Sequence, residues 1–532
     1  MANFELPKSR TGIEGLDQIL EGGLPSGRTS LVSGGPGCGK TVMGLQFICY
    51  GADHGEPGIY ITFEEKKAAV RQNALTLGWN LERLEKKGLM LLLENTLPFE
   101  KVCSGEAGFE ALLDTISEAS GKIGAVRIVV DALDVLLSLF KDPEEERQGM
   151  LRLHQLFNAC GMTALMTAKI PDGPVPAAYG FMDFHVDCAI QLDQRVIDQV
   201  TTRRLRVKKF RGSGFGRNEY PYSIGPGGVR ILPISTLGLR HKPLGAFVSS
   251  GLEELDDVLG GGYRRASSVL IAGATGTGKT SMAATFAREV CGKGETLLYI
   301  SFEESRQAMM SNMLSPGIDL QPAYESGSFR YISGLPEAMG AEEHLLRAFK
   351  EIETYQPDHI VVDAISACKR MGSEKAAFDY VVRLLNLAKE RGITCLLLNQ
   401  TVEASSIQER SGIEISSIID AALSLHMTEE TGEINRTLIC LKSRGSKHSN
   451  QYREYLITDA GVELMAVYIG GGRVLTGTAR KVLEEKEAAE ALKLEQQIEE
   501  RERELEYLKA ARNTLKKGRA ARAVSRGGER HE

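Results

Sequence analysis

The chain has 532 residues, of which 42% are hydrophobic and 25% charged, and its formal net charge of −6 is small for that length. One hydrophobic core stops growing at about 250–300 residues, so this length predicts more than one domain. The nine cysteines form no CxxC pair, and no apolar run reaches the ~18 residues of a membrane span, which argues against disulfide frameworks, zinc sites and membrane proteins. We therefore expect a globular, cytoplasmic protein.

An internal repeat divides the chain into two similar halves. Residues 11–27, TGIEGLDQILEGGLPSG, align with residues 250–266, SGLEELDDVLGGGYRRA, at a shift of 239 positions. The same shift carries Lys40 to Lys279. A shift shared by several motifs indicates a gene duplication, and therefore two domains of one architecture.

Each half alternates short apolar runs with helical patterns, which is typical of a mainly parallel sheet covered by helices on both faces. The sequence therefore predicts an α/β fold. The expected strands are residues 29–34, 58–63, 126–133 and 163–168 in the first half, and 268–273, 297–302, 359–366 and 394–400 in the second.

A glycine-rich loop follows the first strand of each half and precedes a helix. Both loops fit GxxxxGK[ST], whose backbone N–H groups surround phosphate oxygens while the lysine reaches the β and γ phosphates and the hydroxyl binds magnesium. Two copies in register predict two RecA-like P-loop domains that bind ATP and Mg²⁺. The expected nucleotide-binding residues are Gly37, Cys38, Gly39, Lys40 and Thr41, then Gly276, Thr277, Gly278, Lys279 and Thr280.

Acidic residues end two further strands of each half. The pairs Glu64-Glu65 and Glu303-Glu304 follow the second strand, where a carboxylate can take the proton from the oxygen that attacks the γ-phosphate. Such pairs are otherwise solvated helix starts. Asp131 and Asp363 follow the third strand, the place of the acid that holds magnesium, although an aspartate there can also cap a helix.

A KxRG element late in each half carries Lys209 and Arg211, then Lys442 and Arg444. Such cations can enter a neighbouring subunit's site and stabilise the transferring phosphoryl group, or be an ordinary surface pair. Gln400, at the end of its strand, can sense the γ-phosphate or serve as a turn residue.

Residues 1–236 are the predicted first domain, 237–247 a linker and 248–475 the second domain. Residues 476–517 are rich in helix formers and opposite charges, which predicts one long helix, and we expect 518–532 to be disordered. The helix carries a heptad-like stripe that suits a coiled coil, although two arginines interrupt it and a solvated single helix stays open. The stripe comprises Leu494, Ile498, Leu505, Leu508 and Leu515, with Arg501 and Arg512 on the same seam.

Over residues 5–475 the chain resembles the KaiC family, ring-forming ATPases and autokinases of the bacterial clock. The resemblance rests on the paired P-loops, TFEE and SFEES, VVDA in both halves, KFRGS and LKSRGS, and RSGIEISSIIDAALSL. It implies a homohexamer of two stacked rings with nucleotide between neighbouring subunits. The first ring would be a slow ATPase, and the second would phosphorylate and dephosphorylate its own chain, with a KaiB-like partner compatible with this role.

The resemblance also assigns individual residues. The glutamates would be the catalytic bases, and the phosphorylated residues would be Ser416 and Ser417 in EISSIID. The matching first-domain stretch, residues 180–190, has no serine or threonine, which supports hydrolysis there. Contacts from the adjoining subunit to its neighbour's nucleotide would be Arg203, Lys209, Arg211 and Ser213, then Arg436, Lys442, Ser443, Arg444, Ser446 and His448.

The chain departs from the family in three ways. Ser-Ser replaces the usual Ser-Thr, Phe215 stands where the second domain has His448, and the long helix replaces a short activating tail. The helix can instead join hexamers end to end.

Two other functions share the same ATPase core. A RecA- or DnaB-like DNA-dependent ATPase would need basic loops, and residues 203–209, RRLRVKK, are the one strongly basic run of the core. Few aromatics accompany that run, so nucleic acid is not favoured. A nucleotide-gated signalling scaffold without kinase activity is the other alternative.

Overall fold

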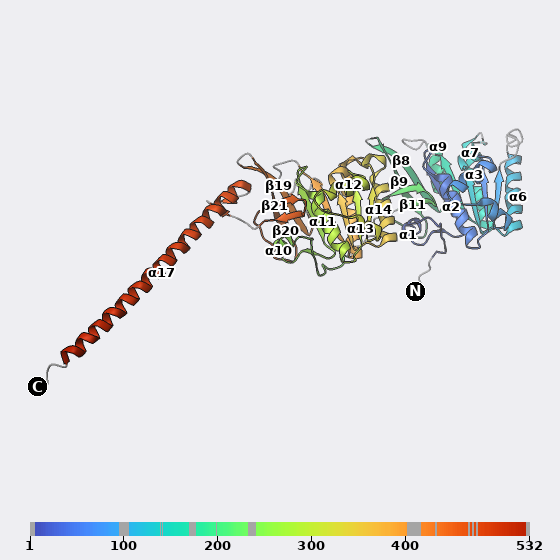
Figure 1. The fold of residues 1–532 in the computed structure, drawn as a ribbon. Helices are drawn as coiled ribbons and strands as arrows, with labels where there is room; N and C mark the ends of the chain where they lie inside the picture. Colours follow the sequence, from blue (N-terminus) through green and yellow to red (C-terminus); the bar gives the residue numbers. More distant parts are fainter. Residues whose placement is uncertain are drawn as a thin grey trace.

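Two sheets with the same strand order form the core of the two domains (Figure 1). The computed structural model describes residues 6–94, 106–138, 140, 142–169, 177–197, 199–231, 241–401, 417–430, 433–465, 469–470, 473–474 and 477–527. Within these residues each sheet has nine strands. The arrangement confirms the predicted α/β architecture of two RecA-like domains followed by a long C-terminal helix.

In the first sheet six strands run parallel and three more extend it as an antiparallel meander. Across the sheet the strands are β5 (Met90–Glu94), β4 (Gly58–Thr62), β6 (Arg127–Asp131), β7 (Thr163–Lys169), β3 (Thr29–Gly34), β8 (Cys188–Ile197), β9 (Val200–Phe210), β10 (Glu219–Gly225) and β11 (Gly228–Ile231). The helices are α1 (Leu16–Ile19), α2 (Lys40–Asp53), α3 (Lys67–Thr76), α4 (Leu81–Lys86), α6 (Glu106–Ile123), α7 (Leu133–Leu137), α8 (Pro143–Ala159) and α9 (Ala177–His185), and β1 (Lys8–Ser9) pairs with β2 (Leu24–Pro25).

The second sheet repeats this order. Its strands are β16 (Phe329–Ser333), β15 (Leu297–Ser301), β17 (His359–Asp363), β18 (Thr394–Gln400), β14 (Ser268–Gly273), β19 (Ala421–Glu430), β20 (Glu433–Ser443), β21 (Arg453–Thr458) and β22 (Gly461–Leu464). Its helices are α10 (Glu253–Leu259), α11 (Lys279–Gly292), α12 (Arg306–Leu314), α13 (Gln321–Glu325), α14 (Ala341–Tyr355) and α15 (Glu374–Arg391), with 3₁₀ turns at Pro336–Ala338 and Ile365–Arg370. Two short ladders pair β12 (Phe247–Val248) with β13 (Tyr263–Arg264), and β23 (Ile469–Gly470) with β24 (Arg473–Val474).

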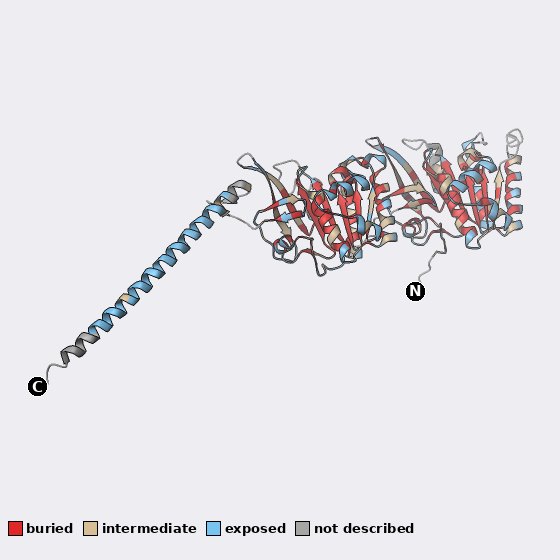
Figure 2. Cartoon of the chain, viewed as in Figure 1, coloured by how far each residue is buried: buried red, intermediate tan, exposed pale blue. Residues whose placement is uncertain are grey.

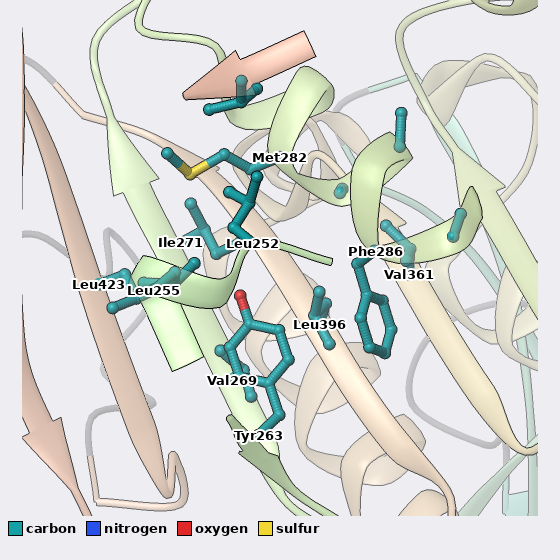
Figure 3. Close-up of a cluster of buried hydrophobic side chains, with 14 of the residues drawn as sticks. Leu252, Leu255, Tyr263, Val269, Ile271, Met282, Phe286, Val361, Leu396 and Leu423 are labelled. Atoms are coloured by element: carbon teal, nitrogen blue, oxygen red, sulfur yellow. The ribbon is translucent and has the colours of Figure 1, made fainter. Parts of the chain in front are cut away.

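Each sheet is buried on both faces, as continuous apolar strands require. On β17, Val361 packs into the cluster beneath α11, whereas Ile360 and Val362 pack into the cluster beneath α14 and α15. Figure 2 shows the resulting buried centre of each domain, and Figure 3 shows the α11 cluster, in which Phe286 and Leu396 lie close together.

The two domains meet where β9 approaches the first turn of α14. Arg203 Nη1 lies 3.3 Å from Glu343 Oε1, and Arg204 Nη2 lies 2.5 Å from Glu342 Oε1. The Glu342 side chain is only 7% exposed. Charge-assisted hydrogen bonds of this kind fix the contact between two surfaces better than exposed ion pairs do.

The long helix α17 (Gly477–Gly527) projects from the second domain, and its described side chains are almost all exposed (Figures 1 and 2). The disorder predicted from residue 518 is wrong for residues 518–527, which continue the helix. The reason is that alanine and arginine are strong helix formers, and the single Gly518 costs only about 1 kcal/mol. No helix in the described part of the chain is long and apolar enough to cross a membrane.

Replacing Phe286 by alanine should destabilise the second domain. The side chain is 0% exposed, so the change leaves a cavity that costs about 3–5 kcal/mol. Differential scanning calorimetry should show a lower Tm for that domain. The control Ile434→Ala alters a side chain that is 66% exposed and should leave the Tm nearly unchanged. Equal losses in the two variants would contradict the assigned core.

Candidate functional site

Each P-loop lies between the first strand of its sheet and the following helix. Lys40 Nζ donates to the carbonyl oxygens of Gly34 (2.9 Å) and Gly35 (2.8 Å). Lys279 Nζ donates to those of Gly273 and Ala274, both at 2.9 Å. Burial lowers the pKa of both lysines. Each loop therefore holds a partly desolvated cation, in a setting where its attraction for phosphate is stronger than in water.

The last glycine of each loop has a backbone conformation that disfavours any other residue. Gly39 (φ +87°) and Gly278 (φ +85°) cap α2 and α11 in the left-handed region. A Cβ atom would lie 2.5 Å from Cδ1 of Ile224 in the first domain and 2.5 Å from Cδ1 of Ile457 in the second. The chain can thus turn directly into a helix whose N-terminal N–H groups face the loop, the arrangement that binds anions.

The predicted magnesium residues come together in both domains. Thr41 Oγ1 donates to Asp131 Oδ2 at 2.9 Å, and Thr280 Oγ1 donates to Asp363 Oδ2 at 3.0 Å. Burial raises the pKa of Asp363 above its ordinary value. A hydroxyl beside a carboxylate is the hard oxygen set that magnesium takes together with nucleotide phosphates, so these residues fit the ion.

A buried tyrosine supports each aspartate. Tyr60 and Tyr299 donate to the same carboxylate oxygens, each at 2.7 Å. The motifs do not include these tyrosines, but the shift of 239 positions relates them, and a search for polar residues repeated at that shift would have found them.

The two glutamates of each pair have different surroundings. Glu65 Oε2 accepts from Asn73 Nδ2 at 2.9 Å, and Glu304 Oε2 accepts from Asn312 Nδ2 at 3.2 Å. The second glutamate is thus held by the following helix.

The first glutamate of each pair lies near charged residues at the ends of the neighbouring strands. Glu64 Oε1 contacts Lys169 Nζ at the end of β7. Burial, and then the charge of Asp363, raise the pKa of Glu303. The first glutamate of each pair is therefore the one placed toward the site.

The predicted contacts to a neighbouring subunit's nucleotide lie on β9, on β20 and in the turns after them. Lys209 Nζ donates to the carbonyls of Asp183 (2.8 Å) and Phe184 (3.1 Å), and Arg211 Nη2 also donates to Phe184 (2.8 Å). Arg203 faces Glu343 of the second domain, and Ser213 Oγ accepts from Lys8 Nζ at 2.6 Å.

The second domain holds its corresponding residues in a similar way. Lys442 Nζ donates to Ile419 O at 2.6 Å, and Arg436 Nε donates to Gly276 O of the same chain's P-loop at 3.1 Å. The hydroxyls of Ser443 and Ser446 lie 2.5 Å apart, and His448 is exposed in the turn beyond them.

One of the two predicted phosphorylation sites lies within the described residues. Ser416 lies outside the described residues, whereas Ser417 is exposed and its carbonyl accepts from Arg444 Nη2 at 2.8 Å. Arg211 makes the same contact to Phe184 in the first domain. Ser417 and Phe184 therefore occupy equivalent positions, one with a hydroxyl and one without.

The basic run at residues 203–209 is largely engaged within the chain. Arg203 and Arg204 pair with glutamates of α14, Lys208 contacts Asp183, and Lys209 donates to carbonyls. Three of these cations are paired with carboxylates and Lys209 is held by carbonyls, so they offer less attraction to a phosphate backbone than free cations would.

Replacing Tyr299 by phenylalanine should weaken Mg²⁺ binding about ten-fold, because partners beyond the ligands orient a carboxylate and tune its affinity. Titration calorimetry of Mg²⁺ into the full chain with a non-hydrolysable ATP analogue measures this. The control Tyr331→Phe removes a hydroxyl that donates to the Glu304 carbonyl at 3.0 Å, so it should keep the affinity. Unchanged affinity in Tyr299→Phe would argue against this supporting role.

Comparison with known proteins agrees with this site. A family model described as "ATPase: KaiC" matches residues 9–236 and 248–467. The chain is 37% identical to the circadian clock protein KaiC2 of Synechocystis sp., over 94% of this chain and 90% of that protein. It is 34% identical to the circadian clock oscillator proteins KaiC of Parathermosynechococcus lividus (90% and 89% covered) and Acaryochloris marina (91% and 93%). The resemblance seen in the sequence is confirmed, and the chain belongs to the KaiC family of ATPases.

Proposed function

We propose that this protein is a double-ring, hexameric Mg²⁺-dependent ATPase whose first domain hydrolyses ATP and whose second domain phosphorylates Ser416 and Ser417. The observation that carries the proposal is the duplicated P-loop lysine, threonine and aspartate, which make the same contacts in both domains, with a glutamate pair after the next strand whose second member is held alike. A timing role is proposed because the relatives are named circadian clock proteins. A KaiB-like partner is proposed from the family resemblance alone.

In the first domain the reaction is hydrolysis. A water oxygen forms a bond to the γ-phosphorus while the bond from that phosphorus to the β–γ bridging oxygen breaks, and its electron pair leaves with ADP. Glu64 accepts the proton of the water, and Lys40 stabilises the negative charge on the phosphate oxygens. A magnesium ion bound at Thr41 and Asp131 would neutralise further charge on the phosphates.

In the second domain a serine hydroxyl replaces water. The serine oxygen bonds to the γ-phosphorus, ADP leaves with the electron pair of the broken bond, and Glu303 takes the hydroxyl proton. Burial raises the pKa of Glu303, which makes its carboxylate a stronger base than an exposed glutamate. Arg444 holds the Ser417 carbonyl at the position that Phe184 occupies in the first domain, which supports a kinase reaction in the second domain alone.

Glu303→Gln should lower phosphate incorporation at least about 100-fold, because the amide cannot accept the proton. Phosphopeptide mass analysis of Ser416 and Ser417 measures this, and phosphate release measures first-domain hydrolysis, which should persist. The control Glu304→Gln alters the glutamate held by Asn312 and should retain most of the incorporation. Undiminished phosphorylation in Glu303→Gln would exclude Glu303 as the base. A parent protein with no phosphate on Ser416 or Ser417 would favour the nucleotide-gated scaffold without kinase activity.

We also propose that pairs of α17 helices join two hexamers. The stripe of Leu494, Ile498, Leu505, Leu508 and Leu515 is exposed along the helix, each side chain by 51–69%. Residues 484–506 carry ten acidic and four basic residues, whereas 507–527 carry seven basic residues and none that are acidic. An antiparallel pair would place each acidic segment against a basic one.

One antiparallel register also accommodates the arginines of the stripe. With Ile498 opposite Leu508 of the second helix, Leu505 lies opposite Arg501, and Leu494 lies opposite Arg512. No two arginines then meet at the seam, and each can extend its charged end to solvent along an apolar partner.

Leu505→Asp should separate the paired hexamers, because it places a carboxylate in the apolar seam. Native mass spectrometry should then show half of the parent mass. The control Leu492→Asp changes an equally exposed leucine that lies off the stripe and should leave the mass unchanged apart from the substitution. A parent protein that is already a single hexamer would contradict the pairing.

A further inference from the structure

The catalytic glutamate proposed for the first domain is in contact with a lysine that no motif contains. Lys169 is the last residue of β7, and its ammonium contacts Glu64 Oε1. The Glu64 carboxylate raises the pKa of Lys169, so the lysine is protonated at neutral pH. Its backbone N–H also donates to Asp134 Oδ1 at 3.0 Å, which fixes the end of the strand.

The strand register places this lysine beside the phosphate loop. Lys169 pairs with Gly34, the first glycine of the P-loop. Lys40, the other cation of the loop, donates to the carbonyl of that same glycine. A triphosphate bound in the loop would therefore bring its negative charge close to both lysines.

The second domain has a neutral residue at this place. Gln400 pairs with Gly273 in the same register, and its amide donates to Thr275 Oγ1 at 2.7 Å. The two domains thus differ in charge at the strand end beside the base, although the surrounding backbone is the same.

The contact between Lys169 and Glu64 can be broken by a bound phosphate. The lysine and glutamate side chains are 46% and 38% exposed, so water screens their attraction and the pair is a weak one. A γ-phosphate carries more negative charge than one carboxylate and can compete for the ammonium. While the pair persists, one oxygen of Glu64 is occupied by a cation and does not accept a proton from water.

We propose that Lys169 is a positioning residue of the first domain, which holds Glu64 until the γ-phosphate of ATP draws its ammonium away. This inference rests on the proposed hydrolysis by the first domain. When the γ-phosphate binds the ammonium, Glu64 is free to take the proton of the attacking water, and incomplete exchange of the ammonium between carboxylate and phosphate limits the rate of hydrolysis in the first domain. ADP, which lacks the γ-phosphate, leaves the pair in place.

The test uses the full chain with Lys279→Ala, which disables the second P-loop in every variant. Lys169→Gln introduces the residue found at the equivalent position of the second domain, Gln400. It should raise kcat for ATP hydrolysis about three-fold, because Glu64 no longer has to leave a weak ion pair. It should also raise KM for ATP about three-fold through loss of the cation at the γ-phosphate. Binding of ADP should stay unchanged.

Two further variants separate this role from a structural one. Lys169→Arg keeps the positive charge and should restore the parent kcat and KM, whereas Lys169→Met should behave as Lys169→Gln. The control Lys293→Gln removes the lysine of an exposed pair with Glu289 at the far end of α11, and should change neither constant. Loss of either change in Lys169→Gln and Lys169→Met, or a change in ADP binding, overturns the proposal.

If the first domain does not hydrolyse ATP as proposed, the experiment gives a different result. In that case the parent chain would hydrolyse no ATP, or Glu64→Gln would hydrolyse ATP as fast as the parent. Hydrolysis that requires Glu64 but is unaffected by Lys169→Gln overturns the role of Lys169 alone.

Discussion

The hydrogen bond from Thr41 to Asp131, repeated from Thr280 to Asp363, is the interaction on which each site depends. It ties the first turn of the P-loop helix to the end of the third strand, so the loop and the carboxylate keep a fixed distance. A buried tyrosine donates a second hydrogen bond to the same aspartate oxygen. Parallel strands deliver all of these groups to one sheet edge, and a glycine with positive φ lets the loop enter the helix there.

The two domains differ around this shared frame. Thr167 donates a hydrogen bond to Asp131, whereas Leu398 occupies the same register in the second domain. Lys169 contacts Glu64, whereas Gln400 turns its amide to the phosphate loop. These differences in charge and hydrogen bonding leave the strand order and register alike in the two sheets. One fold can therefore carry a different reaction in each half.

The domains are also joined physically. Arg203 and Arg204 of β9 bond to Glu343 and Glu342 at the start of α14, so a residue expected beside nucleotide also touches the second domain. At the other end of the chain, α17 leaves the second domain with its apolar stripe exposed and its charge divided between an acidic and a basic half. The ion pairs between β9 and α14 join the two domains of one chain, and the exposed stripe of α17 is available to a second chain.

The sequence by itself determined the duplication, four of the nine strands of each sheet, the two phosphate loops, the paired carboxylates and the long helix, because each leaves a local pattern or a repeated one. It did not show that residues 518–527 would stay helical, since their composition also suits disorder. Only the tertiary structure decided that Lys169 meets Glu64, that Tyr60 and Tyr299 support the aspartates, and that Asn73 holds Glu65. Except for Asn73, these partners are distant in sequence and lie on separate strands or directly after one, so strand order and register bring them together and no local pattern records the contact.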